Sequence, residues 1–210
     1  MQNRNIKSQF LVYLLLLVGL LLPGLATAKT IMILGDSLSA GYGIQSEQGW
    51  VHLLQQRLDQ QYPKQHRVVN ASVSGETTSG ALARLPKLLS THKPDIVVIE
   101  LGGNDALRGQ PPQMISQNLN RLIQLSQAQN RKVVVFGMKI PPNYGAAYSK
   151  AFENNYKTVT QKYRGVRLLP FFLEGVAGNA SLMQSDRIHP NAKAQPKLLE
   201  NAYPYIKGAL

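Results

Sequence analysis

The chain contains five short apolar runs, and most of them end at or near a glycine. Valine, isoleucine and leucine fill nearly every position of these runs, a pattern typical of strands that are buried on both faces of a parallel sheet. We expect strands at residues 30–34, 67–71, 95–101 and 132–136, with a weaker fifth at 166–169.

Between these runs, apolar and aromatic residues recur at a spacing of three to four, which predicts amphipathic helices. The pattern is found at residues 50–62, 82–89, 119–125, 152–159 and 198–203. Strands that alternate with helices five times indicate an α/β domain with right-handed crossovers and helices on both faces of the sheet. Sites in such sheets form beyond the carboxyl ends of the strands, so we expect the chemistry in the loops that follow the strands.

The first 28 residues are predicted to be a secretory signal peptide. Arg4 and Lys7 precede an uninterrupted apolar run at residues 10–22, and small residues lead up to a cleavage site near Ala28. The run has 13 residues, whereas a membrane-spanning helix needs about 20, so a retained membrane anchor is the less favoured alternative. We expect one domain at residues 29–210, in a protein that is periplasmic or secreted after cleavage.

The composition excludes several kinds of site and makes one class of binding partner less favoured. The chain has no cysteine, which excludes disulfides, thiolate zinc sites and a cysteine nucleophile. It is basic, with 23 Lys and Arg against 11 Asp and Glu, but the cations are scattered and form no run that would mark a nucleic-acid-binding arm. We expect a solvated basic surface that allows transient contact with a membrane surface, with no nucleic-acid partner and no dedicated anionic partner. The oligomeric state is not indicated.

A serine and a histidine in this sequence can form a nucleophile and its base. Ser37 follows the first predicted strand, where a serine is most often a helix N-cap, although its own N–H would also be free to bind an oxyanion. His189 lies three residues after Asp186, a spacing that lets the carboxylate orient the imidazole toward a serine. A surface histidine beside an acid is the ordinary alternative.

Two further residues follow predicted strands and can donate hydrogen bonds to an oxyanion. Gly75 offers a backbone N–H at close approach, and Asn104 offers its side-chain amide. Glycine and asparagine also favour ordinary turns, so each signal is weak alone. The catalytic interpretation is favoured because all of these residues converge on one edge of the expected sheet.

The same residues lie in four motifs that resemble the four blocks of the SGNH (GDSL) hydrolase family. The motifs are Gly35-Asp36-Ser37-Leu38-Ser39, Gly75, Gly102-Gly103-Asn104-Asp105 and Asp186-Arg187-Ile188-His189-Pro190. They occur in the family's order and span essentially the whole of residues 29–210. Within the family, further stretches are similar to the enzymes grouped as thioesterase I, protease I and lysophospholipase L1, also called arylesterases; these are residues 34–42, 83–86, 100–108, 141–145 and 169–172.

This resemblance implies a fold and a set of site residues. The implied fold is a three-layer α/β/α sandwich with a five-stranded parallel sheet, of the SGNH or flavodoxin-like type. The implied triad is Ser37 as nucleophile, His189 as base and Asp186 as its orienting acid, with oxyanion donors from Ser37, Gly75 and Asn104. The residues that it places around the substrate are Asp36, Leu38, Arg108, Pro141 and Tyr144. The resemblance implies no metal and no organic cofactor.

The implied function is an exported serine esterase that hydrolyses acyl esters and thioesters. Lysophospholipids, aryl esters and, in vitro, acyl-CoA are the expected small-molecule substrates. One alternative is a carbohydrate acetylesterase of the same family, which a short-chain preference would favour. The other is a non-catalytic lipid- or glycan-binding protein, against which the complete set of Ser37, Asp186, His189 and Asn104 argues.

Overall fold

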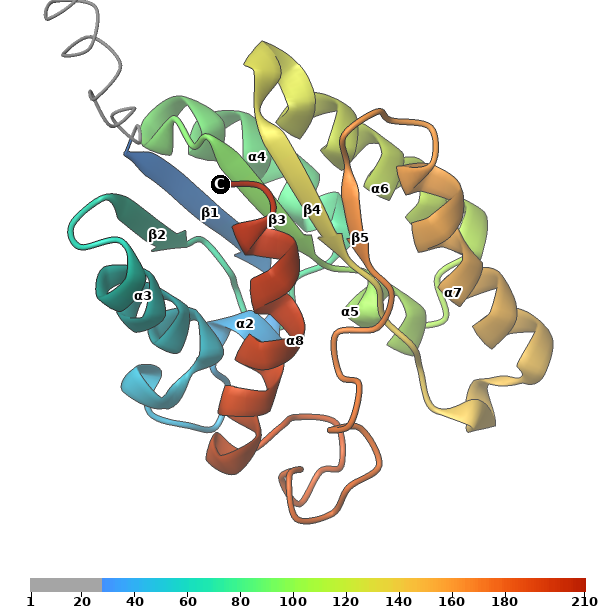
Figure 1. Cartoon of the computed structure of the whole chain (residues 1–210). Helices are drawn as coiled ribbons and strands as arrows, with labels where there is room; N and C mark the ends of the chain where they lie inside the picture. The colour runs from blue at the N-terminus through green and yellow to red at the C-terminus, as the bar shows by residue number, and fades with distance from the viewer. Residues whose placement is uncertain (1–27) are drawn as a thin grey trace, which may run out of the picture.

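The computed structural model describes residues 28–210, which form a three-layer α/β/α sandwich (Figure 1). Its sheet has five parallel strands in the order β2-β1-β3-β4-β5. The strands are β1 (Lys29–Gly35), β2 (His66–Asn70), β3 (Ile96–Glu100), β4 (Lys132–Phe136) and β5 (Arg167–Leu169). All five predicted strands are confirmed, and each end differs by at most one residue. The predicted signal peptide lies outside the described residues.

Helices cover both faces of the sheet, as the fold class requires (Figure 1). On one face α3 (Trp50–Gln61) packs beside α8 (Gln195–Lys207). On the other face α6 (Pro112–Gln127) lies between α4 (Thr78–His92) and α7 (Ala146–Thr160). These five helices confirm the predicted amphipathic segments. Within residues 28–210, no helix has the length and hydropathy needed to cross a membrane.

Several short elements were not predicted, because one or two turns are too short to display an apolar period. At the edge where the strands end, they are α2 (Ser37–Ala40), η1 (Ser46–Gln48), α5 (Gly103–Leu107), η3 (Pro142–Tyr144) and η4 (Ala192–Ala194). At the opposite edge, η2 (Ala128–Asn130) follows α6. We call the edge where the strands end the carboxyl edge and the opposite one the amino edge.

A buried aromatic cluster ties the core to the carboxyl edge. The rings of Trp50, Phe136 and Phe172 pack with centroids 4.8–5.8 Å apart, and all three side chains are fully buried. The indole N–H of Trp50 donates to Ser39 Oγ at 3.3 Å. The core therefore contacts the short helix that begins at Ser37.

Candidate active site

Ser37 is the first residue of α2 and follows the carboxyl end of β1. Asp36 caps this one-turn helix, because its Oδ1 accepts a hydrogen bond from the Leu38 N–H at 3.0 Å. Gly41 ends the helix in the left-handed region, with φ of 77°. The first N–H groups of a helix have no intrahelical acceptor, so the Ser37 N–H can serve a bound group at the same point as its hydroxyl.

The structure brings Ser37 together with His189 and Asp186, although 152 residues separate the serine from the histidine. His189 Nε2 lies 2.9 Å from Ser37 Oγ. Its other ring nitrogen, Nδ1, lies 2.7 Å from Asp186 Oδ2. With Nδ1 donating to the carboxylate, Nε2 is left as an acceptor for the serine proton, which is the arrangement a general base needs.

The loop that carries His189 holds Asp186 as an ionised acceptor. Asp186 Oδ1 accepts from the N–H groups of Ile188 at 2.9 Å and His189 at 3.0 Å. The backbone N–H of His189, followed by its side chain, lowers the pKa of Asp186 to about 2. The loop is anchored by Gln184, whose side chain donates to the carbonyls of Tyr42 and Pro190 at 2.8 and 3.0 Å.

The two further oxyanion donors expected from the sequence are Gly75 and Asn104, both in segments that follow strands. Gly75 adopts φ of 78°, a conformation that glycine adopts at little cost. Asn104, in α5, directs its Nδ2 to Asp36 Oδ2 at 3.0 Å. The turn before α5 is tight, since Gly102 has φ of 108° and a Cβ there would lie 2.5 Å from Tyr156 Oη. The amide of Asn104 is therefore hydrogen-bonded to Asp36, the residue that precedes Ser37.

Two buried carboxyl groups lie beneath the serine turn. Asp36 is 3 % exposed and Glu100 is fully buried. Glu100 Oε2 accepts from the Ser39 hydroxyl at 2.7 Å and from the Asp36 N–H at 3.3 Å. Burial raises the pKa of Asp36 to about 6. Burial, and then the charge of Asp36, raise the pKa of Glu100 well above its usual value, so Glu100 is favoured in its neutral form.

Sequence comparison decides the family to which this site belongs. The GDSL-like Lipase/Acylhydrolase family matches residues 33–195. The chain belongs to the GDSL, or SGNH, hydrolase family. This GDSL hydrolase is 51% identical over 191 residues to the esterase TesA of Pseudomonas aeruginosa, across 90% of this chain and 94% of that protein. It is 44% identical over 171 residues to thioesterase 1/protease 1/lysophospholipase L1 of Escherichia coli (strain K12), across 81% of this chain and 80% of that protein.

A solved structure supports the same assignment. The crystal structure of a TesA matches with a TM-score of 0.83 at 50% sequence identity, covering 87% of this chain and 100% of that one. The fold class inferred from the sequence is therefore confirmed. Family and relatives together make this GDSL hydrolase an ester-hydrolysing enzyme.

The residues expected around the substrate fall into two groups. The side chains of Asp36 and Leu38 are 3 % and 7 % exposed and offer little surface to a ligand. Arg108 and Pro141 lie in loops of the carboxyl edge, and Tyr144 ends η3 at the same edge. Arg108 Nη2 donates to the Gly75 carbonyl at 3.1 Å, and Tyr144 Oη donates to the Leu107 carbonyl at 3.2 Å, which joins η3 to α5. Substrate contact by all five residues stays a prediction.

Sequence reasoning assigned no role to Ser39, Trp50 or Glu100. One signal was available, because Glu100 is a carboxyl group at the end of an otherwise apolar strand. Its contacts with the serine turn depend on the pairing of β1 with β3, in which Gly35 is the partner of Glu100. Among residues 28–210, no group of three or more His, Asp or Glu side chains is arranged to hold a metal ion.

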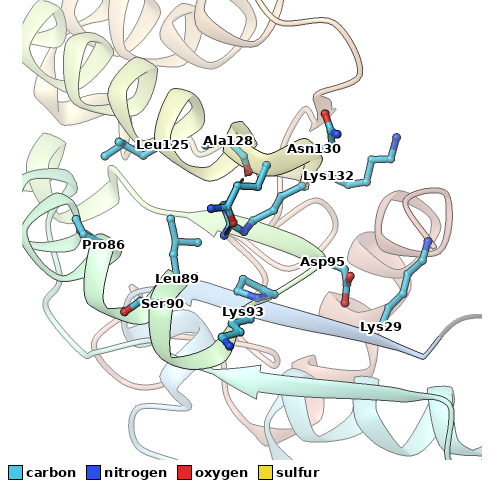
Figure 2. Close-up of a pocket in the computed structure, with 13 residues that line it drawn as sticks. Lys29, Pro86, Leu89, Ser90, Lys93, Asp95, Leu125, Ala128, Asn130 and Lys132 are labelled. Carbon is cyan, nitrogen blue, oxygen red and sulfur yellow. Dashed lines mark hydrogen bonds between the residues drawn. The ribbon is translucent and has the colours of Figure 1, made fainter.

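A cavity of about 690 Å³ lies at the amino edge, between α4 and the segment that joins α6 to β4 (Figure 2). Its lining includes Lys29, Lys93 and Lys132 but no member of the triad and no expected oxyanion donor. Parallel topology places it across the sheet from Ser37. The cavity is therefore separate from the candidate active site.

Proposed function

We propose that this GDSL hydrolase is an exported serine esterase that cleaves acyl esters and thioesters through an acyl-enzyme on Ser37. The observation that carries the proposal is the continuous hydrogen-bonded series from Ser37 Oγ through His189 to Asp186, with distances of 2.9 and 2.7 Å. A serine needs such an oriented base to become nucleophilic.

The reaction proceeds in two steps. Ser37 Oγ bonds to the carbonyl carbon while its proton passes to His189 Nε2; the C–O or C–S bond then breaks, and His189 returns the proton to the leaving alcohol or thiol. Water then attacks the acyl-enzyme, giving a proton to His189, and the bond to Ser37 Oγ breaks as Ser37 is reprotonated and the carboxylic acid leaves. Asp186 stays ionised throughout and stabilises the imidazolium.

The oxyanion formed in each step is stabilised by the N–H groups of Ser37 and Gly75 and by Asn104 Nδ2. The Asn104 amide uses one hydrogen for Asp36 at 3.0 Å and has a second for the oxyanion. Donors of this kind are held before reaction, and the loss of one costs about 2.7–4 kcal/mol of transition-state stabilisation. Asp36 thus acts through Asn104 as well as through the cap of α2.

The surroundings of the triad support a substrate with an apolar acyl group. The large apolar side chains of the described residues that are most exposed are Tyr42, Val73, Met114 and Ile188, at 44–54 %. All four lie at the carboxyl edge, three in loops that follow strands and one in the first turn of α6. The E. coli relative is named as a thioesterase and a lysophospholipase, so lysophospholipids, aryl esters and acyl thioesters are the proposed substrates.

A p-nitrophenyl ester series from acetyl to palmitoyl tests the proposal. Residues 29–210 are expected to hydrolyse the series, and Ser37→Ala is expected to lose at least about 10³-fold in kcat with its fold intact. Trapping the acyl group on the wild-type chain by mass spectrometry identifies Ser37 as the carrier. An optimum at acetyl, with release of acetate from acetylated glycans, would instead indicate the carbohydrate esterase, and no hydrolysis of any ester would indicate a binding protein.

Export is tested separately, by sequencing the N-terminus of the protein recovered outside the cytoplasm. A chain that begins at Lys29 agrees with cleavage after Ala28. A chain that still carries the apolar run at residues 10–22 contradicts the predicted cleavage.

A further inference from the structure

The basic charge that is scattered along the sequence is gathered by the fold at the amino edge. This edge comprises the helix-to-strand connections, with the last residue of each helix and the first residue of each strand. Its cations are Lys29, Lys64, Lys93, Arg131, Lys132, Lys162, Arg164, Arg167 and Lys207. Asp95 is the one acidic side chain in the same segments. Because all five strands are parallel, these residues share one side of the molecule.

The carboxyl edge has the opposite balance. Its strand-to-helix connections, with the last residue of each strand, carry four cations against seven carboxyl groups. The cations are Arg108, Lys139, Arg187 and Lys193, and the carboxyl groups are Asp36, Glu47, Glu76, Glu100, Asp105, Glu174 and Asp186. The net basic charge of the described chain is thus concentrated away from the candidate active site.

The cavity at the amino edge is lined by cations and by apolar side chains (Figure 2). Lys29, Lys93, Arg131 and Lys132 contribute cations to its lining. The apolar part of the lining is Pro86, Leu89, Pro94, Leu125 and Ala128. A hollow lined in this way suits a ligand with an anionic head and an apolar body.

Helix dipoles explain only part of the cluster. Helices end at this edge, and cations near helix C-termini are stabilising within the last turn. That accounts for Lys93, the C-cap of α4, and for Lys207 at the end of α8. It does not account for Lys29 and Lys132, which begin strands. Within residues 28–210, none of the nine cations forms an ion pair with an Asp or Glu side chain. Lys29 Nζ donates a hydrogen bond to the backbone oxygen of Leu210, and Asp95 is the one acidic side chain in the cavity lining.

We propose that the amino edge is a docking surface for an anionic phospholipid bilayer. The nine cations contact headgroup phosphates, and the cavity beside α4 receives the glycerol and upper acyl part of one lipid. Docked in this way, the molecule keeps the Ser37 side open to substrates that arrive from solution. This proposal does not depend on the ester chemistry.

The lining favours lipid over nucleic acid as the anionic partner. Single-stranded nucleic acid is bound by aromatic side chains that stack on its bases, together with a basic groove. None of the thirteen residues that line the cavity is aromatic. Its apolar positions instead match acyl and glycerol carbons. The cations are spread over four helix-to-strand connections, the start of β1 and the end of α8, which matches an extended anionic surface better than a single anion.

Binding of a catalytically inactive variant to lipid vesicles tests the proposal. The test protein is residues 29–210 carrying Ser37→Ala. These residues contain every strand and helix that the structure describes. The whole of the crystallised TesA chain aligns with 87% of this chain. Binding is expected to mixed phosphatidylcholine–phosphatidylglycerol vesicles and not to phosphatidylcholine vesicles. Added salt is expected to weaken it, because surface charges are screened.

Two double variants, each of which loses two positive charges, distinguish binding through the amino edge from binding through the net charge of the whole chain. Each Lys or Arg near an anionic bilayer contributes about five-fold to partitioning, so Lys93→Gln with Lys132→Gln is expected to weaken binding about 25-fold. Lys139→Gln with Lys193→Gln removes the same charge from the carboxyl edge and is expected to change binding by less than about three-fold. Equal losses in the two pairs would overturn the proposal, as would equal binding to both kinds of vesicle.

Two further readouts test the partner and the orientation. Double-stranded DNA that displaces the protein from mixed vesicles at equal charge concentration would overturn the choice of lipid. For the orientation, the wild-type residues 29–210 should hydrolyse p-nitrophenyl acetate at an unchanged rate when vesicles are saturating. A loss of activity on the vesicle, relieved by the carboxyl-edge pair, would show that the Ser37 side faces the membrane and would refute docking by the amino edge.

Discussion

Asp36 provides a test in which stability and activity are expected to move in opposite directions. Its carboxylate is 3 % exposed and accepts hydrogen bonds from the Leu38 N–H and Asn104 Nδ2, each at 3.0 Å. Asp36→Asn keeps the size of the side chain and a good helix N-cap. It removes the buried charge, and it replaces one of the two accepting oxygens with a donor.

The stability effect follows from the pKa of Asp36, which burial raises from 3.8 to about 6. At about 1.4 kcal/mol per pKa unit, this shift corresponds to about 3 kcal/mol. Since the folded pKa exceeds the unfolded one, the folded state binds more protons, and this group lowers the free energy of unfolding as pH rises from about 4 to about 6. Asparagine does not titrate, so the variant avoids that loss.

The gain is partly offset at Asn104. An amide at position 36 presents a donor either to Asn104 Nδ2 or to the Leu38 N–H, and a weakened hydrogen bond costs about 1 kcal/mol. The net expectation at neutral pH is a free energy of unfolding about 2 kcal/mol higher than wild type, vanishing near pH 4, where Asp36 is protonated in the fold. Asn104 is expected to turn its amide over, which brings Oδ1 toward the oxyanion and lowers kcat/KM about 10²–10³-fold.

Urea unfolding at pH 4.5 and 7.5 measures the stability, and p-nitrophenyl butyrate hydrolysis measures the activity. Asn104→Ala is the matched control, because it removes the same oxyanion donor and leaves Asp36 ionised. It is expected to lose activity to a similar extent without becoming more stable at pH 7.5. If Asp36→Asn is less stable than wild type at pH 7.5, the cost assigned to the buried charge of Asp36 is refuted. If the variant keeps its activity within about five-fold, the assignment of Asp36 to the orientation of Asn104 is refuted.

Three further predictions, each with its own substitutions, test other parts of the site. Asp186→Ala is expected to lower kcat/KM at least about 10²-fold and His189→Ala about 10-fold more, because Asp186 orients the base and does not transfer the proton; equal activity of Asp186→Ala and wild type in the ester assay would exclude the triad. Glu100→Gln is expected to keep kcat within about three-fold, since Glu100 is favoured in its neutral form. Glu100→Ala is expected to lower the free energy of unfolding by about 2–5 kcal/mol in urea; a Gln variant as damaged as the Ala variant would mean that the ionised form is needed. Gly102→Ala places a Cβ 2.5 Å from Tyr156 Oη, so Asn104 should move and kcat/KM should fall at least about 10-fold. Adding Tyr156→Phe removes the clashing hydroxyl and should restore part of the activity. If the double variant recovers no activity, the clash is not the cause of the loss.

The strands and the long helices could be predicted because their signals are local. A run such as Ile31–Leu34 is apolar at every position, and burial on both faces of a parallel sheet is the environment that such a run requires. One-turn helices such as α2 and α5 carry no period. They form because Asp36 caps the first and the turn at Gly102 starts the second, and both depend on contacts with residues distant in sequence.

The expected triad was brought together by the fold, since Ser37, Asp186 and His189 lie within hydrogen-bonding distance. Their motifs made this predictable. The supporting contacts were not predictable, because Glu100 reaches Ser39 only through the register of β3 against β1, and a sequence does not display register. The inward orientation of Asp36 could not be predicted either, because its carboxylate accepts hydrogen bonds from the Leu38 N–H and from Asn104 Nδ2, which is distant in sequence.

The clustering of cations at the amino edge could not be predicted from the sequence either. Lys29, Lys93 and Lys132 are separated by 64 and 39 residues, so along the chain they look like isolated surface cations. Each stands at or just before the start of a strand, and parallel pairing of β1, β3 and β4 brings the three to one cavity. A scattered pattern of charge in an α/β sequence is therefore weak evidence for a uniformly solvated surface. The informative quantity is the charge of the helix-to-strand connections taken together, which can be counted as soon as the strands are assigned.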